Sequence, residues 1–224
     1  MTELAYILAQ VEPFNLLNAN QRQAVAENAL RQSIRKGEFL AMDGDDWPYL
    51  FVVCSGALDA IKESAEGRSL IVVSLEAGDL FWGLGFFDPG LSQPVSFLAR
   101  EDGALALWTQ ETLLPILQSN GRMLWTLCQV MVRRMLRASE IVDGLAFQPV
   151  AGRLAHLLMD QLPEHADQPI ARDLTLDDMA ARVGTTREMV CRLLYRFADD
   201  DLIHITRTEY SIIDQDRLAH LAGK

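Results

Sequence analysis

The chain has 224 residues, of which 50% are hydrophobic, and a formal net charge of −11 at pH 7. This composition predicts one large domain or two modest ones and excludes a disordered chain. No apolar run approaches eighteen residues, and the N-terminus has an early Glu3 without a basic leader, so we expect neither a membrane span nor a signal peptide. Three widely spaced cysteines form neither a disulfide framework nor a CxxC metal pair, which predicts a reduced, cytoplasmic protein. The acidity argues against a general polyanion binder but leaves room for a local basic site, because salt screens charges beyond about 8 Å.

The region from about residue 34 to residue 108 is predicted to be β structure. Gly56, Gly67 and Gly78 fall eleven residues apart, close to the turn spacing of a sandwich, barrel or jelly roll. Short β-rich runs lie between turn residues, at 50–55, 57–62, 69–75 and 104–108. The pattern predicts an all-β domain.

A helical region follows. A short helix is predicted over 110–118, and a long one runs from about Arg122 to Gly144. Apolar or small residues recur along the long helix at alternating spacings of four and three, at Leu124, Cys128, Met131, Met135, Ala138, Val142 and Leu145. Such a seam could pack against the chain's own β domain. The strict 3.5-residue period favours a two-helix coiled coil instead, and hence a homodimer.

A second domain is expected to start near residue 147. Pro149 suits the first turn of a helix, and 150–162 continue as an amphipathic helix. The segment PEHADQP, 163–169, is a polar loop in this interpretation.

Two helix starts follow in the sequence LTLDDMAARVGTTREMVCRLLYRF. Thr175 with Asp178, and Thr185 with Glu188, have the spacing of capping boxes. Between them lies the pattern A-x3-G-x5-V, in which a small residue, a turn glycine and a branched apolar residue let two helices cross steeply. We therefore predict a helix-turn-helix whose shared core is Met179, Val183, Val190, Leu193, Leu194 and Phe197.

The second helix of this motif has an outer face suited to a major groove. An arginine there can contact guanine in bidentate fashion and a glutamate can accept from cytosine, each pair discriminating by about 1–3 kcal/mol. Glu188 could instead cap its helix, and the arginines could be ordinary surface residues. The stretch 199–213 predicts a turn, a strand, a turn and a strand, which form a small wing. The candidate DNA-binding residues are Thr185, Thr186, Arg187, Glu188, Cys191, Arg192, Arg196, and, at the wing tip, Arg207 and Thr208.

Over nearly its full length the chain resembles the CRP/FNR family of bacterial transcription regulators. The motifs that support this are VGTTREMVCRLL, GDLFWGLGFFDPG and MVRRMLRASEIVDGLAFQPVAGRLAHLL. The resemblance implies that Arg187, Glu188 and Arg192 read bases, and that the target is a palindrome of TGTGA-like half-sites.

The ligand residues of cyclic-AMP-binding members do not carry over. Where those members have a glutamate for the ribose, this chain has Gly83, and where they have arginine and serine for the phosphate it has Gln93 and Pro94. Their adenine-contacting Thr-Ser pair reads Ala138-Ser139 here. We therefore expect neither cyclic AMP nor cyclic GMP as the effector. The candidate effector pocket, which is either filled or lined for a neutral ligand, comprises Trp82, Gly83, Leu84, Gln93, Pro94, Ala138 and Ser139.

Other cofactors have little support in the sequence. An iron–sulfur cluster needs about four thiolates, and the chain has three cysteines: Cys54, predicted to be buried in a strand, Cys128 on the seam and Cys191 on the recognition helix. Haem stays open, although none of the four histidines lies in the β domain. No metal-ligand spacing is present.

These observations predict an α+β chain. The expected parts are a jelly-roll (double-stranded β-helix) sensor domain over 1–120, a dimerisation helix and hinge over 121–146, and a winged helix-turn-helix over 147–224. The predicted function is a homodimeric regulator that binds double-stranded DNA in the cytoplasm, with RNA polymerase as a further candidate partner and no enzymatic activity. The alternative is a small-molecule, redox or haem sensor whose helix-turn-helix serves protein contacts.

Overall fold

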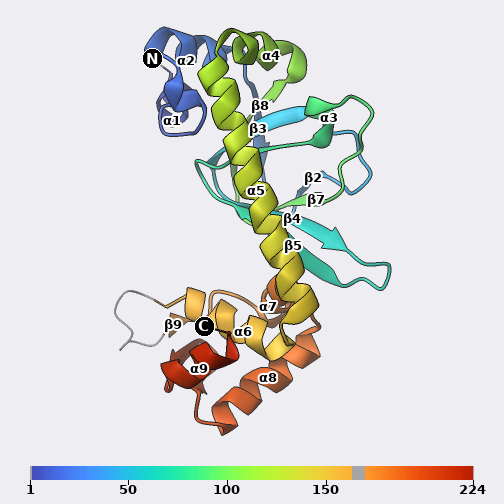
Figure 1. Ribbon diagram of the computed structural model, residues 1–224, viewed down its shortest axis with the longest axis vertical. Helices are drawn as coiled ribbons and strands as arrows, with labels where there is room; N and C mark the ends of the chain where they lie inside the picture. Colours follow the sequence, from blue (N-terminus) through green and yellow to red (C-terminus); the bar gives the residue numbers. More distant parts are fainter. Residues whose placement is uncertain (1, 163–169, 224) are drawn as a thin grey trace. The chain divides into compact units, whose positions relative to one another are not determined.

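The computed structural model describes residues 2–162 and 170–223, which form two compact units (Figure 1). The first unit comprises residues 1–62 and 72–138, and the second comprises residues 63–71 and 139–224. The polar loop predicted at 163–169 lies outside the described residues. Where the structure describes the chain, no helix is long and apolar enough to cross a membrane.

The first unit is built on two four-stranded sheets. One has the strand order β1-β8-β3-β6 and the other β2-β7-β4-β5, and the pairs for which a register is defined are antiparallel. The strands are β1 (Leu30–Ile34), β2 (Phe39–Ala41), β3 (Tyr49–Ser55), β4 (Leu58–Glu63), β5 (Ser69–Leu75), β6 (Leu80–Trp82), β7 (Ser96–Ala99) and β8 (Gly103–Thr109). This confirms the predicted β region.

Alternation along β3 gives the first unit two cores. Because successive side chains of a strand point to opposite faces, Leu50 and Val52 join one buried cluster while Phe51 and Val53 join another. The second of these clusters includes the buried aromatics Trp47 and Phe97, which also belong to this unit. Strand β3 therefore has both of its faces covered.

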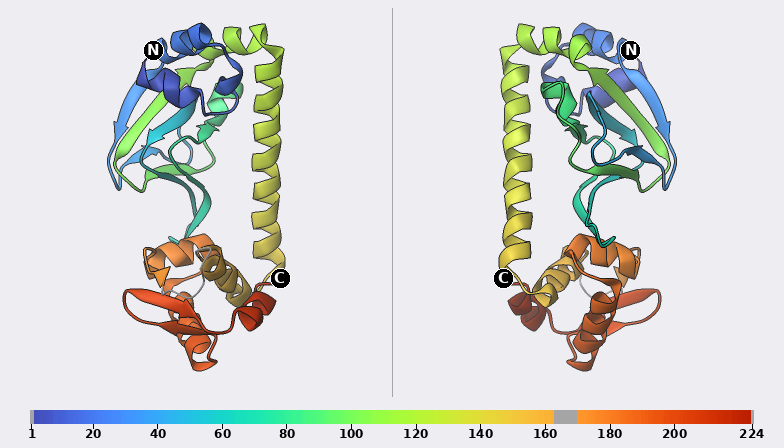
Figure 2. Two further views of the ribbon diagram at one scale, coloured as in Figure 1. Left: turned by 90° about the vertical axis from the view of Figure 1, so that its left-hand side faces the viewer. Right: turned by 90° about the vertical axis from the view of Figure 1, so that its right-hand side faces the viewer.

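Helices cover the face of the β1-β8-β3-β6 sheet on which Leu50 and Val52 lie. They are α1 (Glu3–Leu8), a 3-10 turn (Phe14–Leu16), α2 (Ala19–Glu27), α4 (Gln110–Ser119) and the first half of α5 (Gly121–Phe147), while the short α3 (Leu84–Phe87) follows β6. The indole Nε1 of Trp108 donates to the carbonyl of Val25 over 2.9 Å, which fixes α2 to β8. Met123, Leu127 and Val130 are the buried residues of α5, and their spacing of four and three places them on one helix face. Figure 2 shows α5 as one unbroken helix.

The second unit is a winged helix-turn-helix. Its elements are α6 (Val150–Asp160), β9 (Ile170–Ala171), α7 (Leu176–Val183), α8 (Arg187–Asp199), β10 (Ile203–Ile205), β11 (Glu209–Ile212) and α9 (Gln215–Leu221). The sheet order is β10-β11-β9, and the Tyr210 hydroxyl donates to the carbonyl of Leu158 over 2.9 Å, which holds the wing on α6. Pro149 precedes α6 as its N-cap and is not in its first turn, because its ψ of 150° is extended. The predicted fold class is confirmed.

Candidate nucleic-acid interface

The first helix of the motif starts and stops as the sequence predicts. The Asp178 backbone N–H donates to Thr175 Oγ1 over 3.1 Å, and the Thr175 N–H donates to Asp178 Oδ2 over 2.9 Å, a complete capping box. Helix α7 ends at Val183, and its C-cap is Gly184, whose φ of 70° and ψ of 50° are left-handed. A Cβ atom at Gly184 would also lie 2.7 Å from Leu145 Cδ2, so the turn has two reasons to contain glycine.

The recognition helix α8 begins one residue later than expected. Its N-cap is Thr186, whose hydroxyl accepts from the Met189 N–H over 3.3 Å. The Thr185 N–H instead donates to the carbonyl of Ala180 over 3.0 Å, because the left-handed Gly184 draws Thr185 into the turn. The predicted capping box of Thr185 with Glu188 is therefore wrong.

Glu188 is nevertheless turned toward the start of its helix. Its carboxylate accepts from its own backbone N–H and from the Thr186 hydroxyl, and these bonds, in that order, hold the pKa of Glu188 below its ordinary value. The side chain is exposed. It can rotate toward a base only if these two hydrogen bonds break.

The outer face of α8 borders a hollow. Val190, Leu193, Leu194 and Phe197 are buried in the shared core, as predicted. The opposite face borders a hollow of about 390 Å³, lined by Leu176, Arg187, Glu188, Cys191, Arg192 and Tyr195. The structure brings together four of the predicted DNA-binding residues here. Leu176 was missed, because an apolar residue directly after a cap normally indicates core.

Arg187 already has a partner in the free chain. Its Nη1 lies 3.3 Å from Asp177 Oδ2, and both side chains are more than half exposed, at 61% and 69%. Exposed pairs of this kind contribute about 0–1 kcal/mol, so the guanidinium can exchange this carboxylate for a base. Arg196 is exposed one turn further along α8 and does not line the hollow.

The wing tip is held by an arginine that sequence reasoning missed. Arg207 and Thr208 are exposed in the turn between β10 and β11. The Nη1 of Arg172 donates to the carbonyl of Thr206 over 2.9 Å, and the Arg172 backbone N–H donates to the carbonyl of Thr208 over 2.8 Å. Arg172 therefore fixes the tip without lying at its exposed end.

The end of α5 is tied to α7 through Arg153 of α6. Its Nε donates to the carbonyl of Val183 over 2.8 Å, and its Nη1 donates to the carbonyls of Gln148 over 2.6 Å and Gly144 over 3.3 Å. Burial lowers the pKa of this guanidinium. One charged group thus satisfies backbone acceptors from both helix ends, where a helix lacks internal partners.

The apolar stripe of α5 is wider than the predicted seam. Val142 and Met135 are exposed as a seam requires, at 62% and 64%, and Cys128 is exposed as well. Met131 instead packs against the core of the first unit, and Leu145 lies beside the helix-turn-helix glycine. The exposed apolar face also includes three residues that the sequence analysis did not name, Trp125, Val132 and Leu136. Leu124 and Ala138 are exposed at its margin.

The space around several candidate effector residues is filled by the protein's own backbone and side chains. A Cβ atom at Gly83 would lie 1.8 Å from the Trp47 carbonyl oxygen, so the glutamate of cyclic-AMP-binding members does not fit here. Gln93 is buried and its Oε1 accepts from the Leu84 N–H over 3.3 Å. The ring of Trp82 stacks on Phe81 at 5.0 Å.

The remaining members of the predicted effector set lie outside that packed region. The Pro94 carbonyl accepts from Lys62 Nζ over 2.8 Å, and Lys62 is also paired with Asp43. Ala138 and Ser139 are exposed on α5.

No group of three or more His, Cys, Asp or Glu side chains is placed to hold a metal ion within residues 2–162 and 170–223. Cys54 is half-buried in β3, and burial raises the pKa of its thiol.

Comparisons with known proteins agree with this architecture. Residues 31–120 match the cyclic nucleotide-binding domain family and residues 152–221 match the Crp-like helix-turn-helix domain family. The chain is 30% identical over 165 residues to the cAMP-activated global transcriptional regulator CRP of Haemophilus influenzae, covering 72% of this chain and 74% of that protein. It is 30% identical over 169 residues to the regulator Vfr of Pseudomonas aeruginosa, covering 72% of this chain and 79% of that one.

Solved structures show the same fold. The c-di-GMP responsive regulator CLP of Xanthomonas campestris superposes with a TM-score of 0.76 at 22% identity, covering 88% of this chain and all of that one. A regulator of the Crp/Fnr family from Eubacterium rectale superposes with a TM-score of 0.75 at 21% identity, covering 96% and 99%. The chain therefore belongs to the CRP/FNR family of transcriptional regulators, with a helix-turn-helix of the DNA-binding type.

Proposed function

We propose that the protein is a homodimer that reads a palindromic, TGTGA-like DNA site through α8. The observation that supports this most directly is the hollow on the outer face of α8, where Arg187, Glu188 and Arg192 stand around a half-buried Cys191. Arginine supplies two donors to guanine and glutamate accepts from cytosine. Two such faces, one helical turn of DNA apart, read the two half-sites of a palindrome.

The second chain is proposed to pack against the exposed apolar stripe of α5. Trp125, Val132 and Leu136 together with Cys128 and Met135 form this stripe. The spacing 125, 128, 132, 135 alternates three and four, which is the pattern of a coiled-coil seam. A single exposed apolar residue needs no partner, but a contiguous apolar face of this length does.

Cyclic AMP is not proposed to be the effector, although curated relatives are described as cAMP-activated. An anionic cyclic phosphate needs a cation, and this chain places the neutral, buried Gln93 at the arginine position. Gly83 at the glutamate position contacts the Trp47 backbone. Addition of cyclic AMP is therefore expected to leave DNA affinity unchanged within about twofold, and a large tightening would contradict this part of the proposal.

The test of DNA reading is fluorescence anisotropy with a labelled TGTGA palindrome and a scrambled duplex, at one stated salt concentration. Arg187→Ala and Arg192→Ala should each weaken specific binding by about 1–3 kcal/mol, that is about 5- to 150-fold, and should relax preference at one base pair. The matched control is Arg217→Ala, which removes an exposed arginine from α9 and should have little effect. Equal binding to both duplexes, or equal losses in all three variants, would refute sequence-specific reading by α8.

The wing makes a different contribution. Arg207→Ala should weaken binding to the palindrome and to the scrambled duplex alike, because a phosphate contact carries no base information. The slope of log affinity against log salt should also fall by about 1. A loss confined to the palindrome would show that Arg207 reads bases.

A further inference from the structure

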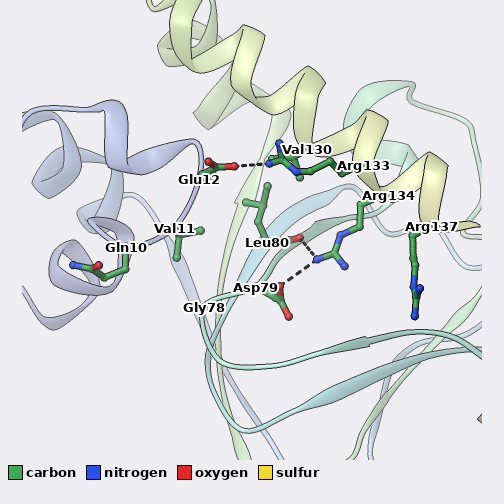
Figure 3. A pocket seen from close by; sticks show the side chains of 10 residues that line it. All are labelled: Gln10, Val11, Glu12, Gly78, Asp79, Leu80, Val130, Arg133, Arg134 and Arg137. Carbon is green, nitrogen blue, oxygen red and sulfur yellow. Dashed lines mark hydrogen bonds and ion pairs between the residues drawn. The ribbon is translucent and has the colours of Figure 1, made fainter. Parts of the chain in front are cut away.

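Arginines hold α5 at two places through different kinds of contact. In the first unit, Arg133 pairs with Glu12 and Arg134 pairs with Asp79, beside a cavity of about 370 Å³ (Figure 3). Each partner there is a partly exposed side-chain carboxylate, which can rotate away. In the second unit, Arg153 of α6 donates to three backbone carbonyls instead. Backbone acceptors cannot move without the helices to which they belong, so this contact is the more constraining of the two.

Two helix ends converge on the Arg153 guanidinium. At the end of α5, its Nη1 donates to the carbonyls of Gly144 over 3.3 Å and Gln148 over 2.6 Å. Its Nε donates over 2.8 Å to the carbonyl of Val183, the last residue of α7. A helix C-terminus has carbonyls without internal partners and the negative end of the helix dipole, so it favours a cation. Because the guanidinium is planar and its donors point in fixed directions, the three bonds define the angle between α5 and α7 as well as their distance.

Two further features make this joint between α5 and the helix-turn-helix rigid. Only Gln148 and Pro149 connect α5 to α6, and the proline ring fixes the φ of Pro149. Leu145 Cδ2 lies so close to Gly184 that an added Cβ there would be 2.7 Å away. Gly184 belongs to the turn between α7 and α8. The end of α5 is therefore held against the turn from which the recognition helix begins.

We propose that Arg153 is a positioning residue that sets the spacing between the two half-sites that the dimer reads. The inference rests on the proposed function, in which two chains meet along α5 and each α8 reads one half-site. The two α8 helices must then lie about one turn of DNA apart, roughly 34–36 Å. Because Arg153 fixes the angle between α5 and each helix-turn-helix, it fixes this separation.

The length of the spacer between the half-sites probes this joint directly. One additional base pair moves the half-sites apart by about 3.4 Å and turns one relative to the other by about 35°. A dimer with two rigid joints can follow this change only if the DNA bends or twists, which costs free energy. A dimer whose joints lack the Arg153 guanidinium can adjust at the joints and should accept several spacers.

Fluorescence anisotropy of the full-length protein on a series of labelled duplexes tests the proposal. Each duplex contains the same two TGTGA-like half-sites with spacers that differ by single base pairs; further duplexes contain a single half-site or a scrambled sequence. The wild-type chain should bind one spacer at least about tenfold more tightly than spacers one base pair shorter or longer. In Arg153→Gln this ratio should fall to about threefold or less. Its affinity for the single half-site should change by less than about twofold, because the base-reading face of α8 is intact.

Two other variants separate the geometry of the joint from its charge. Arg153→Lys keeps a positive charge at the helix ends but has no planar fork, so its spacer ratio should fall as in Arg153→Gln. Arg217→Gln is the matched control, because Arg217 is an exposed arginine of α9 in the same unit, paired with Asp214. Its spacer ratio should equal that of the wild-type chain. Circular dichroism checks that each variant is folded.

Three results would overturn the proposal. One is equal affinity of the wild-type chain for all spacers. Another is an unchanged spacer ratio in folded Arg153→Gln or Arg153→Lys, which would show that the guanidinium does not set the spacing. The third is an equal loss of affinity for the single half-site and for the palindrome, which would make Arg153 a residue that only stabilises the helix-turn-helix. Failure of the proposed function has a different signature, namely equal binding of the wild-type chain to the single half-site and to the scrambled duplex.

Discussion

Substitution of Gly83 by alanine should strongly destabilise the first unit. The added Cβ would lie 1.8 Å from the Trp47 carbonyl oxygen and 2.9 Å from the Trp47 carbonyl carbon, and both atoms are backbone. Residues 83 and 47 cannot separate easily, because the Gly83 N–H also donates to the Tyr49 carbonyl over 2.8 Å. Overpacking of a tight core costs about 1–3 kcal/mol, and we expect about 3 kcal/mol or more here because no flexible side chain can move aside.

Urea unfolding followed by tryptophan emission measures this change in the correct unit, since Trp47, Trp82, Trp108 and Trp125 all lie within the first unit. With a urea dependence of about 1–3 kcal/mol/M, a loss of about 3 kcal/mol should lower the midpoint by about 1–3 M. Gly121→Ala is the control, because no atom lies within 4 Å of its added Cβ.

The same substitution bears on ligand choice. Gly83→Glu should be at least as destabilising as Gly83→Ala and should not produce cyclic AMP binding. A Gly83→Ala midpoint equal to that of Gly121→Ala would refute the packing argument, and with it the steric reason against a glutamate at position 83.

Three other changes test separate parts of the molecule. Burial raises the pKa of Tyr210 to about 12 from 10.0, so the stability that this phenol contributes should be complete below pH 10 and lost as the pH rises from 10 to 12. Tyr210→Phe removes the hydroxyl that donates to the Leu158 carbonyl and should lower the free energy of unfolding by about 1–3 kcal/mol at neutral pH. Chemical denaturation of this variant should no longer show the alkaline loss. Gly184→Ala should cost about 1–2 kcal/mol from its left-handed backbone, with more from contact with Leu145, and circular dichroism melting that shows no loss would contradict this. Val132→Asp should make the chain monomeric in analytical ultracentrifugation, whereas an unchanged dimer would place the interface elsewhere.

Much of the fold followed from local patterns. The period-two strands, the glycines at the turns and the Thr175 capping box each specify a short segment by itself, and the structure has them where they were predicted. The N-terminal helices α1 and α2 were not predicted. Helix α2 has few apolar residues, and only Val25 and Ala26 of this helix are buried.

The candidate sites were harder to predict because they depend on which helix face the rest of the chain covers. The heptad spacing of α5 fits two sets of positions. The structure distinguishes them because Met131, which belongs to the predicted set, packs against the core of the first unit. Arg133 and Arg134 are adjacent in sequence and look like the flank of a coiled coil. The pairing of Arg133 with Glu12, more than one hundred residues away, and of Arg134 with Asp79 follows only from the folded arrangement.

The ion pair between Arg187 and Asp177 has a consequence for DNA affinity. In the free chain the carboxylate of Asp177 occupies the arginine, and the start of α8 occupies the Glu188 carboxylate. Contact with any DNA requires these internal bonds to be exchanged, and only a duplex that offers a guanine and a cytosine in register returns bonds of equal quality. The free energy of breaking the ion pair with Asp177, about 0–1 kcal/mol for an exposed pair, therefore lowers the affinity for every duplex by the same amount. Removal of Asp177 should strengthen binding to the palindrome and to scrambled DNA by about the same factor and leave the ratio between them unchanged.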